Sequence, residues 1–242
     1  QFHHLVRTVP RRGRLIVNGE DERLAEVLAM GSWTPVERFG FDPALEWSAR
    51  LVNEDGSAFA VLHHGAAIGE VRWPMLGRHN VLNGLAALAA AHAVGVDIAS
   101  VIPALADFRS VKRRLEIIGQ SNGITIYDDF AHHPTAIQTT LQGLRAKVGT
   151  ARIVVAMEPR SNSMRLGAHA EALAPSLDGA DAVVFLHRPE LAWDAGKVVS
   201  AIRGEARTVA DVDALIEALG SMARSGDHVV FMSNGGFDGA PR

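Results

Sequence analysis

One stretch of this sequence passes from strand to helix: Ile124-Thr125-Ile126-Tyr127-Asp128-Asp129-Phe130-Ala131-His132-His133-Pro134. Its β-branched and aromatic opening favours a strand. Pro134 suits the first turn of a helix, because its missing N–H would have no partner there. Two acids and two histidines therefore follow a strand, where open α/β sheets bind ligands. The simpler alternative is a capped turn, in which Asp129 accepts backbone N–H groups and the histidines are surface residues.

Length and composition exclude several classes of protein. The 242 residues, 48% of them hydrophobic, suffice for one large or two ordinary domains. A net charge of −3 argues against a nucleic-acid partner, and the absence of cysteine excludes disulfides and thiolate metal sites. We find neither a signal peptide nor an apolar run of membrane-spanning length, so we expect a cytoplasmic protein without a membrane partner. The chain starts without Met and in mid-pattern, which suggests a fragment.

The first part of the chain predicts an α/β unit followed by a β-meander. A strand at 15–18, a helix at 22–30 and a strand at 36–40 lead into three alternating runs at 46–52, 57–63 and 67–73. His63 and His64 are neighbours on one of these runs and would point to opposite faces. We therefore expect structural roles for both histidines, and no metal site in the chain.

An alanine-rich helix follows at about 76–91, and such a helix can pack close to a sheet. His79, Asn80 and Asn83 lie in its first turn, with the two asparagines on one face. A carboxamide matches the paired N6/N7 edge of adenine. The alternative is that Asn80 caps the helix while Asn83 pairs locally, and the sequence favours neither. Asp97 is expected to cap a further helix reaching Phe108.

A new series of strands and helices begins near residues 108–111. Strands at 124–127, 153–157, 182–186 and 227–232, with a brief strand at 205–209, alternate with helices and predict a doubly wound parallel sheet. Polar loops at 128–133, 158–165 and 233–236 would line one crevice if their strands are neighbours. The cations Lys112, Arg113 and Arg114 precede this series, either on a solvated edge or facing phosphates.

Three ordered motifs resemble those of the Mur ligases, ATP-dependent amide-forming enzymes of peptidoglycan synthesis. They are Gly77-Arg78-His79-Asn80-Val81-Leu82-Asn83, Arg113-Arg114-Leu115-Glu116 and Asp128-Asp129-Phe130-Ala131-His132-His133-Pro134-Thr135. The variant Phe130-Ala131 and the segments 158–162 and 233–237 are similar to one branch of the family. That branch joins UDP-N-acetylmuramate to the recycled tripeptide L-alanyl-γ-D-glutamyl-meso-diaminopimelate. The resemblance covers essentially the whole chain.

The resemblance implies a domain organisation. Residues 1–108 would be the latter part of the central ATP-binding domain, a mixed sheet with a meander, and residues 109–242 a Rossmann-like domain for the incoming tripeptide. The sequence contains no G-x-x-x-x-G-K-[ST] phosphate loop, since Gly196-Lys197 lacks the preceding glycines and the following hydroxyl. ATP and Mg²⁺ would then be bound mainly by a segment before residue 1, and this chain alone would be inactive.

The resemblance also implies a reaction, in which the muramate carboxylate forms an acyl phosphate with ATP and the tripeptide amine attacks it. Arg114 and His133 would serve the reacting groups. The expected nucleotide-binding residues are His79, Asn80, Asn83, Arg114, Asp129 and His132, with the asparagines on adenine and Asp129 on ribose. The expected tripeptide-binding residues are Arg160, Ser161, Asn162, Arg165, Ser233 and Asn234.

Three other functions remain open from the sequence. One is ligation of L-alanine to UDP-N-acetylmuramate, and another is a non-catalytic module that binds nucleotide or peptide. The third is a metallohydrolase that uses Asp129, His132 and His133. Adjacent histidines rarely bind one metal together, and no third ligand has a conventional spacing.

Overall fold

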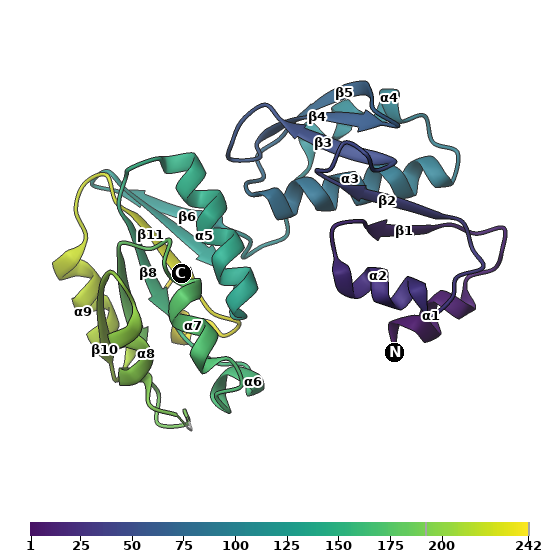
Figure 1. Cartoon of the computed structure of the whole chain (residues 1–242). Helices are drawn as coiled ribbons and strands as arrows, with labels where there is room; N and C mark the ends of the chain where they lie inside the picture. The colour runs from purple at the N-terminus through teal and green to yellow at the C-terminus, as the bar shows by residue number, and fades with distance from the viewer. Residues whose placement is uncertain (192, 242) are drawn as a thin grey trace. The chain divides into compact units, whose positions relative to one another are not determined.

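The structure is a computed structural model that describes residues 1–191 and 193–241 (Figure 1). It divides into two compact units, unit 1 (Gln1–Arg109) and unit 2 (Ser110–Arg242). None of the helices in these described ranges is long and apolar enough to cross a membrane.

Unit 1 is built on a five-stranded sheet in the order β1-β2-β3-β4-β5. Strands β1 (Leu15–Asn18), β2 (Val36–Gly40) and β3 (Trp47–Leu51) are parallel, whereas β4 (Ala58–His63) and β5 (Ala66–Arg72) continue as an antiparallel meander. The helices are α1 (Phe2–Thr8), α2 (Glu22–Ala29), α3 (Arg78–Ala93) and α4 (Ile98–Val101), followed by the 3₁₀ helix η1 (Ile102–Asp107). The mixed sheet with a meander predicted from the alternating runs is confirmed.

Helix α3 packs closely on this sheet, as its alanine content predicts. It buries Val81, Leu85 and Leu88 in the core of unit 1. A Cβ added to Gly84 would lie 2.9 Å from the Trp73 ring, so this approach requires glycine. The single helix predicted from Ile98 to Phe108 is wrong. Pro103 cannot donate an N–H to a helical hydrogen bond, and the chain tightens there into η1.

Unit 2 contains a six-stranded sheet in the order β10-β9-β8-β11-β7-β6. Its strands are β6 (Glu116–Ser121), β7 (Ile124–Asp129), β8 (Ile153–Met157), β9 (Ala182–Leu186), β10 (Glu205–Val209) and β11 (His228–Met232). All pairs are parallel except β6 with β7. The helices are α5 (Pro134–Val148), α6 (Asn162–Arg165), α7 (Ala170–Ser176), α8 (Ala195–Ala201), α9 (Val212–Met222) and the 3₁₀ helix η2 (Phe237–Gly239).

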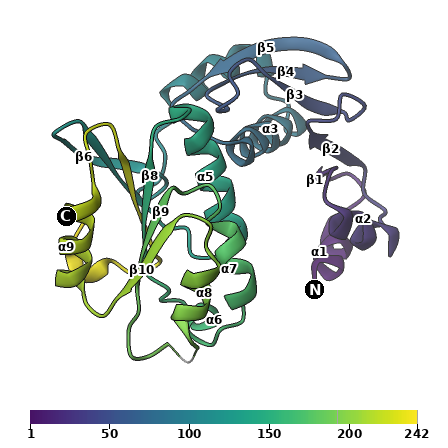
Figure 2. The same cartoon turned by 60° about the vertical axis from the view of Figure 1, so that its left-hand side comes forward.

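Helices cover both faces of this sheet, as the doubly wound prediction requires (Figure 2). Helices α5, α7 and α8 pack on one face, where Val155 and Val183 point. Helix α9 packs on the other face, against the neighbouring residues Val154 and Val184. Because successive strand residues point to opposite faces, strands buried on both sides consist of continuous apolar runs.

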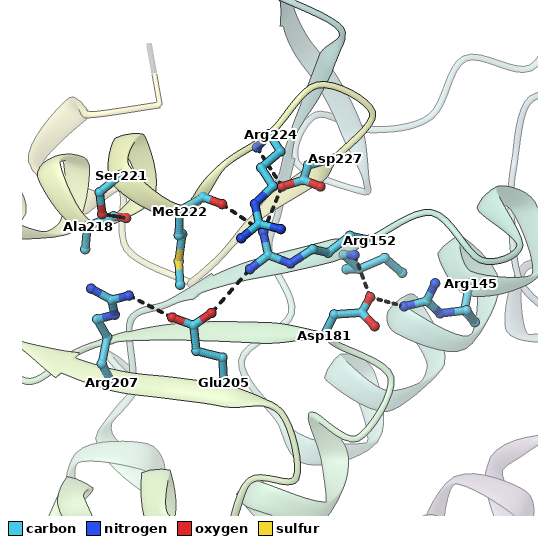
Figure 3. A network of polar contacts seen from close by, with 11 residues as sticks. Arg145, Arg152, Asp181, Glu205, Arg207, Ala218, Ser221, Met222, Arg224 and Asp227 are labelled. Carbon is cyan, nitrogen blue, oxygen red and sulfur yellow. Dashed lines mark hydrogen bonds and ion pairs between the residues drawn. The ribbon is translucent and has the colours of Figure 1, made fainter.

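A polar network ties together the amino ends of the strands in unit 2 (Figure 3). Arg152 donates to the Met222 carbonyl at 2.8 Å, to the Asp227 carboxylate at 3.0 Å and to Glu205 at 3.5 Å. Arg145 forms a similar ion pair with Asp181, which precedes β9. These contacts fix α9, β8, β10 and β11 at the amino edge and leave the carboxyl edge of the sheet to the polar loops.

Candidate functional site

The polar loops after β7, β8 and β11 meet at the carboxyl edge of the sheet. Strand β11 lies between β7 and β8 and pairs in parallel with both. Beyond the strands, the Ser233 N–H donates to the Asp129 carbonyl at 3.2 Å, and the Glu158 N–H donates to the Met232 carbonyl at 3.1 Å. The predicted convergence of loops 128–133, 158–165 and 233–236 is therefore confirmed.

Glu158 lies at the centre of these loops and is fully buried. One carboxylate oxygen accepts from the Arg188 Nε at 2.8 Å. The other accepts from the Ser233 hydroxyl at 2.9 Å and the Phe237 N–H at 3.2 Å. Burial acts to lower the pKa of Arg188, but its bonds to Glu158 and Asp238 outweigh this and raise it. The sequence did not single out Glu158 or Arg188, although Glu158 opens the polar loop after β8.

A basic hollow lies beside Glu158. It has a volume of about 170 Å³ and is lined by Pro159, Arg160, Arg165, Arg188, Glu190, Leu191 and Asp238. Arg160 and Arg165 are exposed, and Arg160 lies 3.4 Å from Glu158 and 3.7 Å from Asp238. A planar guanidinium can pair bidentately with a carboxylate. The hollow is therefore suited to a ligand that carries carboxylates.

The other predicted tripeptide residues have different environments. Ser161 caps the short helix α6 through its hydroxyl, while Asn162 is exposed. Ser233 is fully buried and donates to Glu158, so its hydroxyl orients a buried acid. The Asn234 side-chain oxygen is buried without a hydrogen-bond partner among the described residues. A buried polar atom normally has a partner, so this oxygen is an unsatisfied acceptor in the loop after β11.

Asp128 and Arg113 form the main ion pair of the loop after β7. The Arg113 Nε donates to both Asp128 oxygens, at 3.2 and 3.0 Å, and an Nη donates to the Ser233 carbonyl at 2.7 Å. Arg113 therefore joins two of the loops, a role that the sequence did not assign to it. Arg114 is exposed, with its guanidinium carbon 5.4 Å from the centre of the Phe130 ring. Unlike Arg113, Arg114 therefore remains accessible to an anionic ligand.

Asp129 is 3% exposed, and both of its oxygens bind backbone N–H groups. They accept from Ala131 at 2.7 Å and from Leu115 at 2.6 Å. Burial raises the pKa of Asp129, and these two bonds only partly counteract it. These contacts agree with the capped-turn alternative. The ribose contact stays a prediction and requires the second lone pair of a carboxylate oxygen.

His132 and His133 diverge after the strand. The His132 Nδ1 lies 2.8 Å from the Phe130 carbonyl, which holds its ring against the loop. His133 is the N-cap of α5, where its Nδ1 accepts from the Thr135 N–H at 3.3 Å. Burial, with smaller contributions from His169 and His132, lowers the pKa of His133. Because Nδ1 is the acceptor, a neutral His133 carries its proton on Nε2, and this exposed N–H can donate a hydrogen bond to a ligand.

The metallohydrolase alternative is not supported by the arrangement of these side chains. In the described part of the chain, no group of three or more metal-ligating side chains that lie close together includes Asp129, His132 or His133.

The predicted adenine residues lie at the start of α3 in unit 1. Gly77 is the N-cap, so the alternative that Asn80 caps the helix is wrong. Asn80 instead donates to the Leu76 carbonyl at 2.7 Å, and Asn83 pairs locally with Asn80 at 3.4 Å. His79 is half-buried, while Asn83 is exposed and has a free side-chain oxygen position. Adenine binding by these residues stays a prediction.

Two sequence families match the chain. The Mur ligase middle domain matches residues 1–91, and the family described as Mur ligase, glutamate ligase domain matches residues 113–235. A curated relative from Escherichia coli (strain K12), named UDP-N-acetylmuramate--L-alanyl-gamma-D-glutamyl-meso-2,6-diaminoheptandioate ligase, is 47% identical over 99% of this chain and 52% of its own length. A UDP-N-acetylmuramate--L-alanine ligase from Desulfitobacterium hafniense is 33% identical over 76% of this chain and 40% of its own length.

Solved structures of Mur ligases also match the chain. A murein peptide ligase from Psychrobacter arcticus 273-4 matches with a TM-score of 0.72 and 40% identity, over 98% of this chain and 52% of that protein. A UDP-N-acetylmuramate-alanine ligase from Thermotoga maritima matches with a TM-score of 0.73 and 26% identity, over 94% of this chain and 50% of that protein. The chain thus spans about half the length of the relatives that it matches.

Proposed function

The chain belongs to the Mur ligase family, and from this premise we propose that it serves an ATP-dependent, ADP-forming ligase. The proposed reaction joins UDP-N-acetylmuramate to the tripeptide L-alanyl-γ-D-glutamyl-meso-diaminopimelate in peptidoglycan recycling. The observation that carries this proposal is the basic hollow at the carboxyl edge of unit 2, with Arg160, Arg165 and Arg188 in its lining.

The tripeptide is preferred over L-alanine for two reasons. The relative named for the tripeptide substrate is 47% identical over 99% of the chain, against 33% over 76% for the L-alanine ligase. The tripeptide also carries several carboxylates, whereas L-alanine carries one. Arg160 and Arg165, the two exposed arginines of the hollow, match the peptide better, because each guanidinium can hold one carboxylate bidentately.

The predicted site residues of unit 2 have the following proposed parts in this reaction. Arg160 and Arg165 bind tripeptide carboxylates, and Asn234 accepts an N–H of the peptide. Arg114 offsets negative charge that develops as the reacting carboxylate is activated. The exposed Nε2–H of His133 donates a hydrogen bond to an oxygen of the reacting groups on which negative charge develops. Asn162 is exposed and can contact the tripeptide, while Ser161 and Ser233 hold the loops that bind it.

The nucleotide roles rest on the motifs of the family. Asn80 and Asn83 hold adenine and His79 supports them in unit 1, while Asp129 and His132 of unit 2 contact the ribose and its surroundings. The exposed carboxamide of Asn83 fits a purine edge, which needs one donor and one acceptor. ATP, with Mg²⁺, supplies the phosphoryl group that makes the muramate carboxylate reactive. The cytoplasmic location expected from the sequence stays a prediction, and a non-catalytic binding module stays the alternative function.

Calorimetry on the purified chain tests the substrate assignment. The chain should bind the tripeptide at least about tenfold more tightly than L-alanine, a difference of about 1.4 kcal/mol. Equal binding of the two, or none of the tripeptide, would remove the tripeptide proposal. A phosphate-release assay on the complete enzyme, with UDP-N-acetylmuramate, tripeptide and Mg·ATP, separates the ligase from the binding module.

A further inference from the structure

Unit 1 contains a separate cluster of polar side chains that the proposed ligase reaction does not use. Glu37 lies on β2, His63 ends β4 and His92 lies in the last turn of α3. One ligand atom from each of these residues lies within 4.8 Å of the other two. Three elements far apart in the sequence therefore bring one carboxylate and two imidazoles together.

Trp47 holds two of these side chains in place. Its Nε1 donates to one Glu37 oxygen at 2.8 Å, and its ring stacks on His63 with the ring centres 4.2 Å apart. The His92 ring meets the same indole edge-on, at 5.2 Å. Trp47 is itself fully buried, so its position is fixed by the core. Hydrogen bonds from a surrounding residue to a ligand orient metal ligands in many proteins.

The ligand types and the charge of the cluster also suit a cation. An imidazole offers a ring nitrogen lone pair to a metal, and the Glu37 carboxylate supplies a negative charge. The Glu37 side chain is 14% exposed, and its second oxygen lies 3.3 Å from the Arg14 guanidinium. Arg14 is 44% exposed and can therefore turn into solvent when a cation takes its place.

His63 and His92 face a hollow of unit 1 with a volume of about 380 Å³. It is lined by Trp47, His63, Ile68, His92, Gly95, Val96, Asp97, Ile98 and Ala99. Solvent can thus reach the imidazoles and complete a coordination sphere. Metal–ligand bonds of about 2.0–2.1 Å require ligand atoms about 3.4 Å apart. His92 is exposed at a helix end, so a small rotation of its side chain can close that distance.

We propose that Glu37, His63 and His92 form a binding site for a divalent transition metal of the Zn²⁺ type, which joins β2, β4 and α3. Two imidazoles and one carboxylate suit Zn²⁺, whereas Mg²⁺ and Ca²⁺ prefer oxygen ligands alone. With three protein ligands, the remaining position is left to water. No short sequence motif predicts this site, because its three ligands lie on elements that are far apart in the sequence.

Zinc titration of the purified, metal-stripped chain tests the site. We expect one Zn²⁺ per chain in competition with a chromogenic chelator, a higher melting temperature with Zn²⁺, and a change in the fluorescence of the stacked Trp47. His92→Gln and Glu37→Gln should each weaken binding by more than about tenfold. His92 is exposed, so its variant should fold and melt like the parent chain when metal is absent.

The prediction that His63 and His64 point to opposite faces is wrong, because the chain turns at His64 with a φ of +49° and the centres of the two rings lie 4.4 Å apart. His4→Gln is therefore the matched control, because His4 is an exposed histidine of unit 1 outside the cluster. This variant should retain Zn²⁺ binding within about twofold. The proposal is overturned if the parent chain takes up no stoichiometric Zn²⁺, or if His92→Gln and Glu37→Gln bind it as the parent does. Equal loss of binding in His4→Gln would also overturn it, since binding would then be a general property of surface histidines.

Discussion

The fully buried carboxylate of Glu158 accepts a hydrogen bond from the Ser233 hydroxyl at 2.9 Å, which joins the loops after β8 and β11. The same carboxylate pairs with Arg188 at 2.7 Å. One buried acid therefore fixes both walls of the basic hollow. Its removal leaves the buried Ser233 hydroxyl without its acceptor and takes one of two acids from Arg188, which keeps Asp238 at 2.9 Å. Breaking a buried ion pair from one side in this way is costly.

Glu158→Ala should accordingly reduce the free energy of unfolding by about 3 kcal/mol, because a buried ion pair is broken from one side. Urea unfolding followed by circular dichroism measures the change. Glu217→Ala, which removes an exposed glutamate from α9, is the control and should change it by less than about 0.5 kcal/mol. Equal stability of the two variants would mean that Glu158 does not organise the hollow.

Arg160→Ala or Arg165→Ala in the complete enzyme should raise the KM for the tripeptide by about tenfold and leave that for ATP nearly unchanged. The expected loss is about 1.5–3 kcal/mol for a hydrogen bond to a charged group, reduced by the exposure of these side chains. Arg203→Ala is the control, because the Arg203 side chain is 84% exposed and lies outside the hollow. If Arg160→Ala and Arg165→Ala both keep the wild-type KM for the tripeptide, the loop after β8 has a structural role and does not bind the tripeptide.

Two of the helical glycines, Gly84 and Gly220, should respond to alanine in opposite directions. A Cβ at Gly84 would lie 2.9 Å from Trp73, whereas a Cβ at Gly220 in α9 meets nothing within 4 Å. Gly84→Ala should cost about 1–3 kcal/mol through overpacking. Gly220→Ala should stabilise unit 2 by about 0.5–1 kcal/mol, because alanine is the better helix former. Thermal unfolding of both variants measures this difference, and changes of the same sign would contradict the close approach of α3.

Stability should fall as the pH drops below about 6.5, the ordinary pKa of histidine. Burial, opposed by Asp227, lowers the pKa of His228, whose Nδ1 lies 3.0 Å from the Tyr127 hydroxyl. The unfolded chain then binds the proton more readily than the folded one, so acid favours unfolding. The contribution of a neutral His228 to stability is fully present above the pKa of the histidine in the unfolded chain. It is lost as the pH falls through the lower pKa of His228 in the folded chain.

His228→Gln should therefore flatten the decrease in stability between pH 7.5 and 5.5. Urea unfolding at several pH values is the measurement, and His4→Gln is the control for loss of an exposed histidine. Part of the slope should persist, because His63 and His133 also have lowered pKa values. A slope in His228→Gln equal to that of the parent would show that His228 does not contribute.

Most of the fold was predictable because its signals are local. The continuous apolar run Ile153–Met157, for example, predicts a strand buried on both faces, and β8 is one. The meeting of the loops after β7, β8 and β11 was also predictable, because neighbouring parallel strands end at the same edge of a sheet. Pro103 shows the limit of this reasoning. The helix predicted across 98–108 did not take into account that proline has no N–H, and the segment divides there into α4 and η1.

The partners of the site residues were harder to predict than their positions. The pairing of Glu158 with Arg188, and that of Arg113 with the Ser233 carbonyl, join residues that are far apart in the sequence. No periodicity or spacing encodes such pairs, because they depend on which strands become neighbours. The family motif pointed to Arg114, yet the buried ion pair belongs to Arg113, which turns inward with a φ of +61°.

The chain by itself should bind ATP weakly and turn nothing over. It contains no phosphate-loop motif, and phosphate and Mg²⁺ contacts normally supply much of nucleotide affinity and the charge neutralisation of phosphoryl transfer. We expect a dissociation constant for ATP above about 1 mM, which corresponds to less than about 4 kcal/mol. Calorimetry with ATP, and phosphate release with UDP-N-acetylmuramate, tripeptide and Mg·ATP, measure both properties. Substrate-dependent turnover by the purified 242-residue chain would place the catalytic apparatus within it and refute the assignment of ATP and Mg²⁺ binding to another segment.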